Sequence, residues 1–226
     1  MAKALRDLGY AVGRHQARSL MREAGVWAGY RRRYRVTTDS DHRQPVFENR
    51  LKREFSVDAP ERVWAGDITY VWTQEGWLYL AVVIDLYSRK KVVGWSMGRR
   101  LSSALVCEAL TMALWRRCPP KGQLIHHSDP GVQYASYAFR RLLKDHGIAG
   151  SMSRKGDCWD NTVVESFFGT LKCERVHWRR YQTHAEAHAD IVDYIAMFYT
   201  SRRLHSYLGY RSPDEFERNA PVAKVA

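Results

Sequence analysis

Three acidic residues, Asp67, Asp129 and Glu165, lie in local sequences that hold a carboxylate in a fixed place. Asp67 lies in V-W-A-G-D-I-T-Y-V, an apolar run rich in β-branched and aromatic residues that predicts a buried strand. Asp129 ends Q-L-I-H-H-S-D and precedes Pro-Gly, which is typical of a strand that stops at a turn. Glu165 lies near the start of D-N-T-V-V-E-S-F-F-G-T-L-K-C-E, whose amphipathic pattern predicts a helix.

Three carboxylates on two strands and a helix offer the hard oxygen ligands that Mg²⁺ prefers. We therefore expect these three acids to be catalytic ligands of two Mg²⁺ ions, with Mn²⁺ as a substitute. Two cations about 3.5–4 Å apart activate an oxygen nucleophile and stabilise the leaving oxygen during displacement at phosphorus. Asp67 is the expected bridging ligand, with Asp129 completing one site and Glu165 the other. The alternative is structural, since a lone Asp at a strand end is usually a turn residue and a lone helical Glu is usually solvated.

The composition favours a polyanionic partner. The chain has 226 residues, and 36 lysines and arginines against 24 acids leave a formal charge of +12. Its sequence contains neither a long apolar run nor a signal-peptide pattern, so we expect a cytoplasmic, nucleoid-associated protein without a membrane partner. The four cysteines form no C-x-x-C pair, which argues against a zinc ribbon or a disulfide framework.

The charge is concentrated at the N-terminus. Residues 1–53 hold 13 lysines and arginines against five acids. We expect a basic, partial helix-turn-helix segment over 1–36, in which an arginine stripe on the second helix docks on DNA phosphates. A solvated helix face is the alternative for that stripe alone, but more arginines follow it at once. The expected DNA-binding residues here are Arg14, Arg18, Arg22, Arg31, Arg32, Arg33 and Arg35.

The remaining sequence predicts an α/β core. A polar linker over 37–60 leads to a core over 61–216, with a tail over 217–226. Three strands joined by tight links precede a helix–strand–helix–strand–helix pattern, which predicts a mixed five-stranded sheet flanked by helices. The strands are expected over 63–72, 77–87, 91–97, 123–129 and 148–153.

Several long motifs resemble one family when taken in order. They are W-A-G-D-I-T-Y-V, G-W-L-Y-L-A-V-V-I-D-L-Y-S-R, H-S-D-P-G-V-Q-Y, S-M-S-R-K-G-D-C-W-D-N-T-V-V-E-S-F-F-G-T-L-K and R-R-L-H-S-Y-L-G-Y-R-S-P. They resemble bacterial insertion-sequence transposases, and more narrowly the second-frame product with a retroviral-integrase-like catalytic core. The resemblance implies an RNase H-like fold in which Asp67, Asp129 and Glu165 match the acidic DDE triad.

The same resemblance implies a function and partners. The expected activity is Mg²⁺-dependent DNA cleavage and strand transfer at the ends of an insertion element, which is DNA transposition. Double-stranded DNA, as element ends and as target, is then the substrate. Bringing two ends together implies a homodimer or larger assembly, and a first-frame partner or frameshift fusion is a further expected partner.

Further polar residues are candidates for DNA contact around the acids. Lys172 lies two helical turns after Glu165, and a loop of basic residues precedes that helix. For each of them a solvated surface position is the alternative, and a packed C-terminal hairpin is the alternative for the last two. These candidates are Arg154, Lys155, Lys172, Arg203 and His205.

Other polar or aromatic residues are interpreted as structural. Asp85 has Arg89 as an expected ion-pair partner, and only one of the adjacent His126 and His127 can face the site. His184 and His188 have helical spacing but lack the Glu of a zinc motif. The tryptophans expected in strands, at positions 64, 72, 77 and 95, are attributed to core or sheet-face packing.

Two departures from the family pattern leave other functions open. Pro130 follows Asp129 where an Arg is usual, and an extra residue at Lys90 or Lys91 requires either a bulge or an inverted strand. A DNA-binding protein whose catalysis has decayed is therefore one alternative. An RNase H-type nuclease acting on RNA–DNA hybrids is a less favoured one, because a groove-reading basic helix does not suit hybrids.

Overall fold

The computed structural model describes residues 1–27, 45–51, 57–88, 90–153 and 162–219. The chain divides into two compact units, Met1–Arg33 and Tyr34–Ala226. Several residues named above lie outside the described ranges, so their predictions stay predictions. They are Arg31, Arg32, Arg33, Arg35, Arg89, Arg154 and Lys155.

The N-terminal unit contains two helices, α1 (Ala2–Asp7) and α2 (Arg14–Glu23). Gly9 has a φ of 93°, a left-handed conformation that suits glycine and ends the first helix. On α2 Ala17 is buried, whereas the expected stripe of Arg14, Arg18 and Arg22 is exposed. The stripe is therefore available for contact with phosphates.

The larger unit is built on one five-stranded sheet in the order β3-β2-β1-β4-β5. β1 pairs antiparallel with β2, β2 pairs antiparallel with β3, and β4 pairs parallel with both β1 and β5. This arrangement confirms the predicted mixed sheet. The strands are β1 (Val63–Thr73), β2 (Gly76–Asp85), β3 (Lys91–Gly98), β4 (Ile125–Ser128) and β5 (Ala149–Met152).

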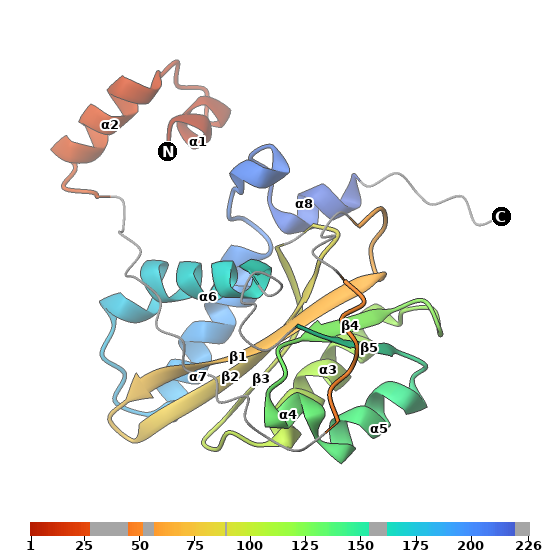
Figure 1. Cartoon of the computed structure of the whole chain (residues 1–226). Coiled ribbons are helices and arrows are strands. Elements are labelled where there is room, and N and C mark those ends of the chain that lie inside the picture. Colours follow the sequence, from red (N-terminus) through yellow and green to blue (C-terminus); the bar gives the residue numbers. More distant parts are fainter. Residues whose placement is uncertain (28–44, 52–56, 89, 154–161, 220–226) are drawn as a thin grey trace. The chain divides into compact units, whose positions relative to one another are not determined.

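Helices cover both faces of the sheet (Figure 1). One face is packed by α3 (Ser103–Arg117), α4 (Val132–Ala135) and α5 (Tyr137–Asp145). The other is packed by α6 (Thr162–Glu174), α7 (His184–Asp193) and a π-helical continuation, η3 (Tyr194–Tyr199). Short 3₁₀ turns, η2 (Val176–Trp178) and η4 (Ser206–Leu208), and a final helix, α8 (Pro213–Arg218), complete the fold. No helix in these described ranges is both long enough and apolar enough to cross a bilayer.

Alternation along β1 divides the hydrophobic residues into two cores. Ala65 and Val71 join the cluster under α6 and α7, whereas Trp64 joins the cluster under α3 and α5. Successive strand residues point to opposite faces, so a strand buried on both sides reads as a continuous apolar run. The long apolar runs of β1 and β2 have this origin.

β3 accommodates the extra residue with a bulge. Val83 pairs with Gly94 and Ile84 pairs with Val92, so Val93 has no partner of its own on β2. Val92 and Val93 are both buried, in opposite cores. The bulge therefore keeps the register on each side of it, and the strand does not invert.

Part of the segment expected to be a linker packs against the core. The Arg50 backbone N–H donates to the Ser151 hydroxyl at 3.0 Å, and Leu51 is buried beneath α6 and α7. The Phe47 ring packs over Gly150, where an added Cβ would lie 2.7 Å from the ring. Residues 45–51 thus lie against the edge strand β5 and cover groups that would otherwise be open to pairing.

Candidate active site

Asp67 and Asp129 are brought together by the pairing of β1 with β4. The parallel register ends with Ala65 beside His127, so two residues further on Asp67 and Asp129 are neighbours. Side chains two residues apart on a strand share a face, and adjacent strands are about 4.8 Å apart. β4 ends at Ser128, so both carboxylates lie where the two strands diverge.

The turn after β4 fixes the Asp129 side chain. The Gly131 N–H donates to Asp129 Oδ1 at 3.3 Å. A Cβ at Gly131 would lie 3.1 Å from the same oxygen, so glycine leaves room for the carboxylate. Pro130 is buried and has no N–H, and the next residue supplies a donor to the carboxylate instead.

Glu165 approaches the other two acids from the first turn of α6. Val164, Phe167 and Phe168 bury the adjoining face of the helix in the core, and Glu165 itself is half-buried. Burial raises the pKa of the Glu165 carboxyl. This effect opposes the helix dipole, whose positive end favours an ionised carboxylate in the first turn.

The charges of Asp129 and Glu165 both act on Asp67, although the ligand atoms of the three acids do not all lie within 4.8 Å of one another. Burial, and then the nearby charge of Asp129, raises the pKa of Asp67 well above its ordinary value, and Glu165 adds to the shift. The Ile68 N–H donates to Asp67 Oδ1 at 2.7 Å, which favours the ionised form of Asp67. Lys172 acts in the same direction and lowers the pKa of Asp67. The structure thus brings the predicted triad and Lys172 into one electrostatic site.

Lys172 is held beside this cluster. Its ammonium lies 4.8 Å from the centre of the Tyr70 ring, a cation–π distance. Burial lowers the pKa of Lys172, and the charge of Asp67 acts against that effect. The position two turns after Glu165 therefore places the cation where the sequence predicted.

A buried aromatic wall, which the sequence reasoning missed, backs the acids. A Cβ on Gly66 would lie 2.8 Å from His126 Nε2 and 3.3 Å from the Tyr134 hydroxyl, so only glycine fits before Asp67. Burial lowers the pKa of His126 to about 3, so its ring is neutral. Burial, and then the charges of Asp67 and Asp129, raises the pKa of Tyr134. The available sequence signal for the close approach of His126 and Tyr134 to β1 was Gly66, directly before Asp67.

His127 points away from His126, as strand alternation requires. His127 Nδ1 lies 2.9 Å from the Ser151 hydroxyl on β5, whereas His126 stacks against Tyr134 and Phe139. Both histidines are buried. Their roles are in packing and hydrogen bonding.

Arg203 and His205 occupy a packed corner, which favours the structural alternative over DNA contact. Arg203 Nε donates to both Glu174 oxygens, at 3.0 and 2.8 Å. His205 is 4% exposed and packs edge-on against Tyr199. His205 therefore has no free surface for a phosphate. The Arg203 side chain remains 23% exposed, so a phosphate contact by Arg203 stays a prediction.

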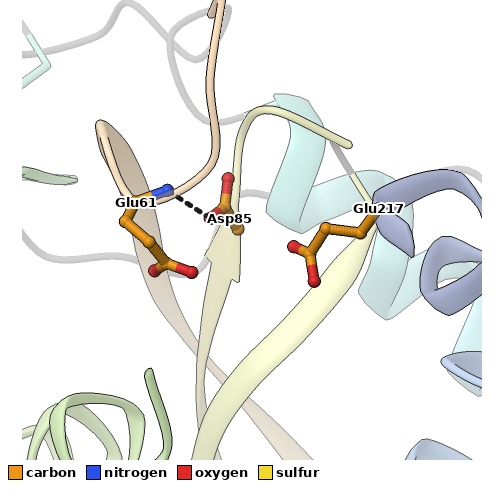
Figure 2. Close-up of side chains that lie close together, drawn as sticks. All are labelled: Glu61, Asp85 and Glu217. Carbon is orange, nitrogen blue, oxygen red and sulfur yellow. Dashed lines mark hydrogen bonds between the residues drawn. The ribbon is translucent and has the colours of Figure 1, made fainter. Parts of the chain in front are cut away.

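A second acidic cluster comprises Glu61, Asp85 and Glu217 (Figure 2). Among the described residues it is the one group of three possible metal ligands whose ligand atoms all lie within 4.8 Å of one another. Arg117 pairs with both glutamates, and Glu217 also pairs with Lys91. This cluster, which we call the acidic clasp, therefore has its own counter-ions.

Asp85 is the buried centre of the acidic clasp. It accepts hydrogen bonds from the backbone N–H groups of Glu61 and Tyr87, at 2.9 and 2.8 Å, and from Trp64 Nε1 at 3.3 Å. Burial raises the pKa of Asp85 to about 6. Asp85 therefore ties the segment before β1 to the end of β2, which is a structural role.

Comparisons with known proteins agree with this geometry. Residues 57–158 and 165–220 match the family described as Integrase core domain. Over 213 residues the chain is 44% identical to Transposase InsF for insertion sequence IS3A of Escherichia coli (strain K12), covering 94% of this chain and 73% of that protein. The chain belongs to the insertion-sequence transposases with an integrase core.

Solved structures show the same fold as this transposase. The simian T-cell lymphotropic virus intasome, in complex with PP2A regulatory subunit B56 gamma, matches with a TM-score of 0.59 and 16% identity, over 84% of this chain and 66% of that chain. The HTLV-2 integrase catalytic core domain in complex with magnesium, in its trimeric form, matches with a TM-score of 0.52 and 16% identity, over 70% and 97%. The predicted RNase H-like fold is thereby confirmed.

Proposed function

We propose that the chain catalyses DNA cleavage and strand transfer at the ends of an insertion element, with Asp67, Asp129 and Glu165 as its metal ligands. The proposal is supported chiefly by the side-by-side placement of Asp67 and Asp129 at the point where two strands diverge, with the charge of Glu165 acting on Asp67 from α6. Buried like charges are unfavourable in isolation, so a cluster of this kind suits a site that a cation completes.

The chemistry of the donors fits Mg²⁺. All three side chains supply carboxylate oxygens. The pKa of Asp67 is raised by burial first and then by the charge of Asp129, and a bound divalent cation would offset both effects. The charges of both other acids act on Asp67, so Asp67 is the candidate bridging ligand. When bound, two such ions activate the attacking oxygen and stabilise the leaving oxygen at phosphorus.

The chain's own residues position the DNA. Lys172 lies beside the acids and is a candidate contact for the phosphate next to the one that reacts. The wall of Gly66, His126 and Tyr134 closes the site from behind with buried groups. The exposed arginine stripe of α2 is proposed to bind phosphates of double-stranded DNA. Two element ends must meet for transfer, so we propose at least a dimer, with a first-frame partner as a further component.

A strand-joining assay tests the proposal. DNA carrying the terminal repeats of the element is incubated with the chain and Mg²⁺ or Mn²⁺, and the products are resolved by size. We expect Glu165→Gln to lower joining by more than the roughly 10- to 100-fold that outer-shell changes at metal sites cause. Glu108→Gln is the matched control. This carboxylate is exposed on α3, and within the described part of the chain it accepts a hydrogen bond from the Ser96 hydroxyl.

Two further measurements, of duplex binding and of hybrid cleavage, separate the alternatives when they are combined with the joining assay. Replacing Arg14, Arg18 and Arg22 with alanine is expected to weaken binding of the duplex, and to flatten its salt dependence by up to about 0.9 per lost phosphate contact. Specific binding of the ends with no joining by the wild type would contradict the catalytic proposal and support a decayed enzyme. Cleavage of the RNA strand in a hybrid, without DNA joining, would support the nuclease alternative.

A further inference from the structure

The end of the β1–β2 hairpin carries four aromatic residues on one face. Trp72 pairs with Trp77 across the strands, and Tyr70 pairs with Tyr79. The Trp72 and Trp77 rings lie edge to face at 4.8 Å, and Tyr70 meets Trp77 in the same way at 4.9 Å. Trp72 is 54% exposed and Trp77 is 45% exposed. We call Tyr70, Trp72 and Trp77 the aromatic platform.

Sheet packing, which the sequence favoured for these tryptophans, does not account for the platform. The hairpin is anchored by other groups, since the Gln74 N–H donates to the Tyr181 carbonyl at 3.0 Å and the His184 N–H donates to Glu75 at 2.7 Å. Thr73 also forms an isolated bridge with Tyr181. A cross-strand aromatic pair adds only about 0.5–1.5 kcal/mol. Two indoles half open to water are therefore available to a partner.

The platform begins beside the acidic triad. Tyr70 lies three residues beyond Asp67 on β1 and Trp72 lies five beyond it, which places them about 10 and 16 Å along the strand. Lys172 connects the two regions, because its ammonium sits over the Tyr70 ring while its charge acts on Asp67. An odd offset turns Tyr70 and Trp72 to the opposite face of β1 from Asp67, so a strand that leaves the acids reaches the platform past Lys172.

Two exposed arginines lie near this end of the sheet, together with the carboxylate of Glu75. Exposed Arg99 lies near Glu75, whose pKa is lowered first by the hydrogen bond from the His184 backbone and further by the charges of His184 and Arg99. Exposed Arg180 directly precedes Tyr181, the residue that bridges to the hairpin. Flat aromatic faces among cations are the combination that single-stranded nucleic acid binds, by base stacking and by phosphate contact.

We propose that the aromatic platform stacks unpaired bases of the DNA strand that runs from the active site. The occupant is unpaired because a base inside a duplex already has both of its faces covered by its neighbours. The edge-to-face arrangement of Trp72 and Trp77 leaves the face of at least one indole open to such a base. This inference rests on the proposed function, since it takes the strand at the triad to be DNA.

A binding measurement tests the platform. Fluorescence anisotropy in EDTA compares two labelled duplexes of one arbitrary sequence, the first fully paired and the second with an overhang of about three nucleotides. Stacking is insensitive to sequence, so the element's own ends are not needed. We expect the wild type to bind the overhang duplex more tightly. The double variant Trp72→Ile/Trp77→Ile is expected to lose roughly 5- to 100-fold of that preference.

Matched variants separate stacking from folding. Isoleucine favours strands but has no ring, whereas Trp72→Phe keeps a ring and should keep most of the preference. Trp115→Ile replaces an 81% exposed tryptophan on α3 and should leave the preference intact. The ratio of the two affinities does not depend on the fraction of chain that is folded, so a stability loss alone cannot produce the effect.

The outcomes distinguish this inference from the proposed function. A wild type that joins DNA, with a Trp72→Ile/Trp77→Ile variant that retains the full overhang preference, overturns the platform and leaves the function standing. A wild type that joins no DNA but loses its overhang preference in the double variant supports the platform and removes the function. A double variant that changes the sedimentation of the free chain and not the preference overturns the platform in favour of self-association.

Discussion

At the scale of single residues, the position of the acids lowers the stability of the metal-free protein. Burial raises the pKa of Asp67, and the charges of the neighbouring Asp129 and of Glu165 raise it further. Lys172 and the Ile68 N–H offset part of that effect. A site that binds cations must hold like charges together before the cations arrive, so stability and function oppose each other here.

Asp67→Asn is therefore expected to stabilise the metal-free chain. The amide removes a charge from the cluster and can still accept the Ile68 N–H, so the free energy of unfolding in EDTA should rise by about 0.5–2 kcal/mol. Mg²⁺ should raise the melting temperature of the wild type but not that of Asp67→Asn, because ligand binding to the folded state stabilises it. Urea denaturation and thermal melting measure both effects, with the exposed Asp145→Asn as control. Destabilisation in EDTA, or an equal response to Mg²⁺, would contradict the proposed ligand role.

At the scale of elements, the bulge in β3 determines how α3 packs. Val93 and Gly94 follow each other at the bulge and both meet the α3 side of the sheet. A Cβ at Gly94 would lie 2.3 Å from the Ala109 carbonyl oxygen and 2.8 Å from Ala113, so the helix rests on the bare backbone of the strand. The extra residue is thus absorbed without changing either core.

Gly94→Ala is expected to be strongly destabilising. Overpacking costs typically 1–3 kcal/mol, and contact with helix backbone cannot be relieved by a side-chain rotation, so we expect about 3 kcal/mol or more. Gly98→Ala in the same strand is the matched control, because its Cβ would meet Leu105 at 3.4 Å, an ordinary contact. Urea denaturation of both variants checks the prediction. Equal stabilities would show that α3 does not rest on Gly94.

The sequence predicted the elements better than their long-range contacts. The five strands and the helices over 103–117 and 137–146 follow from periodicity and from stop signals such as Gly147, whose φ of 68° ends α5. Thr183 accepts from the Glu186 N–H at the start of α7, which is the hydrogen bond that the sequence pattern Thr-x-x-Glu favours. The sequence could not show that Arg203 donates to Glu174, 29 residues away. A motif that contains Arg203 and His205 fits a packed corner and a phosphate contact equally well.

At the scale of the whole molecule, the two groups proposed to meet DNA belong to different units of the chain. The exposed arginine stripe lies in the N-terminal unit, whereas the acids lie in the larger one. In the larger unit the acidic clasp joins segments that are far apart in sequence. Arg117 at the end of α3 donates to Glu217 on α8 at 3.0 and 2.9 Å and also pairs with Glu61 before β1. The attachment of α8 to the rest of this unit therefore depends on largely buried ion pairs.

The clasp makes the stability of this unit depend on pH through Asp85. The pKa of Asp85 is about 6 in the folded chain and 3.8 for an unperturbed Asp side chain, so between these values the folded chain binds the extra proton. The free energy of unfolding then falls as the pH rises through this window, by about 3 kcal/mol in total. The contribution is fully present below about pH 4 and lost above about pH 6.

Asp85→Asn isolates this dependence because the amide does not titrate. The variant loses acceptor capacity at a constant cost, since Glu61, Tyr87 and Trp64 all donate to the Asp85 carboxyl. Urea denaturation at about pH 4, 5, 6 and 7 should show the stability advantage of the wild type over Asp85→Asn shrinking by up to about 3 kcal/mol. Burial also raises the pKa of Glu61, and that part of the slope remains in both proteins. A difference between the two proteins that is constant from pH 4 to 7 would show that Asp85 is ionised throughout in the folded chain.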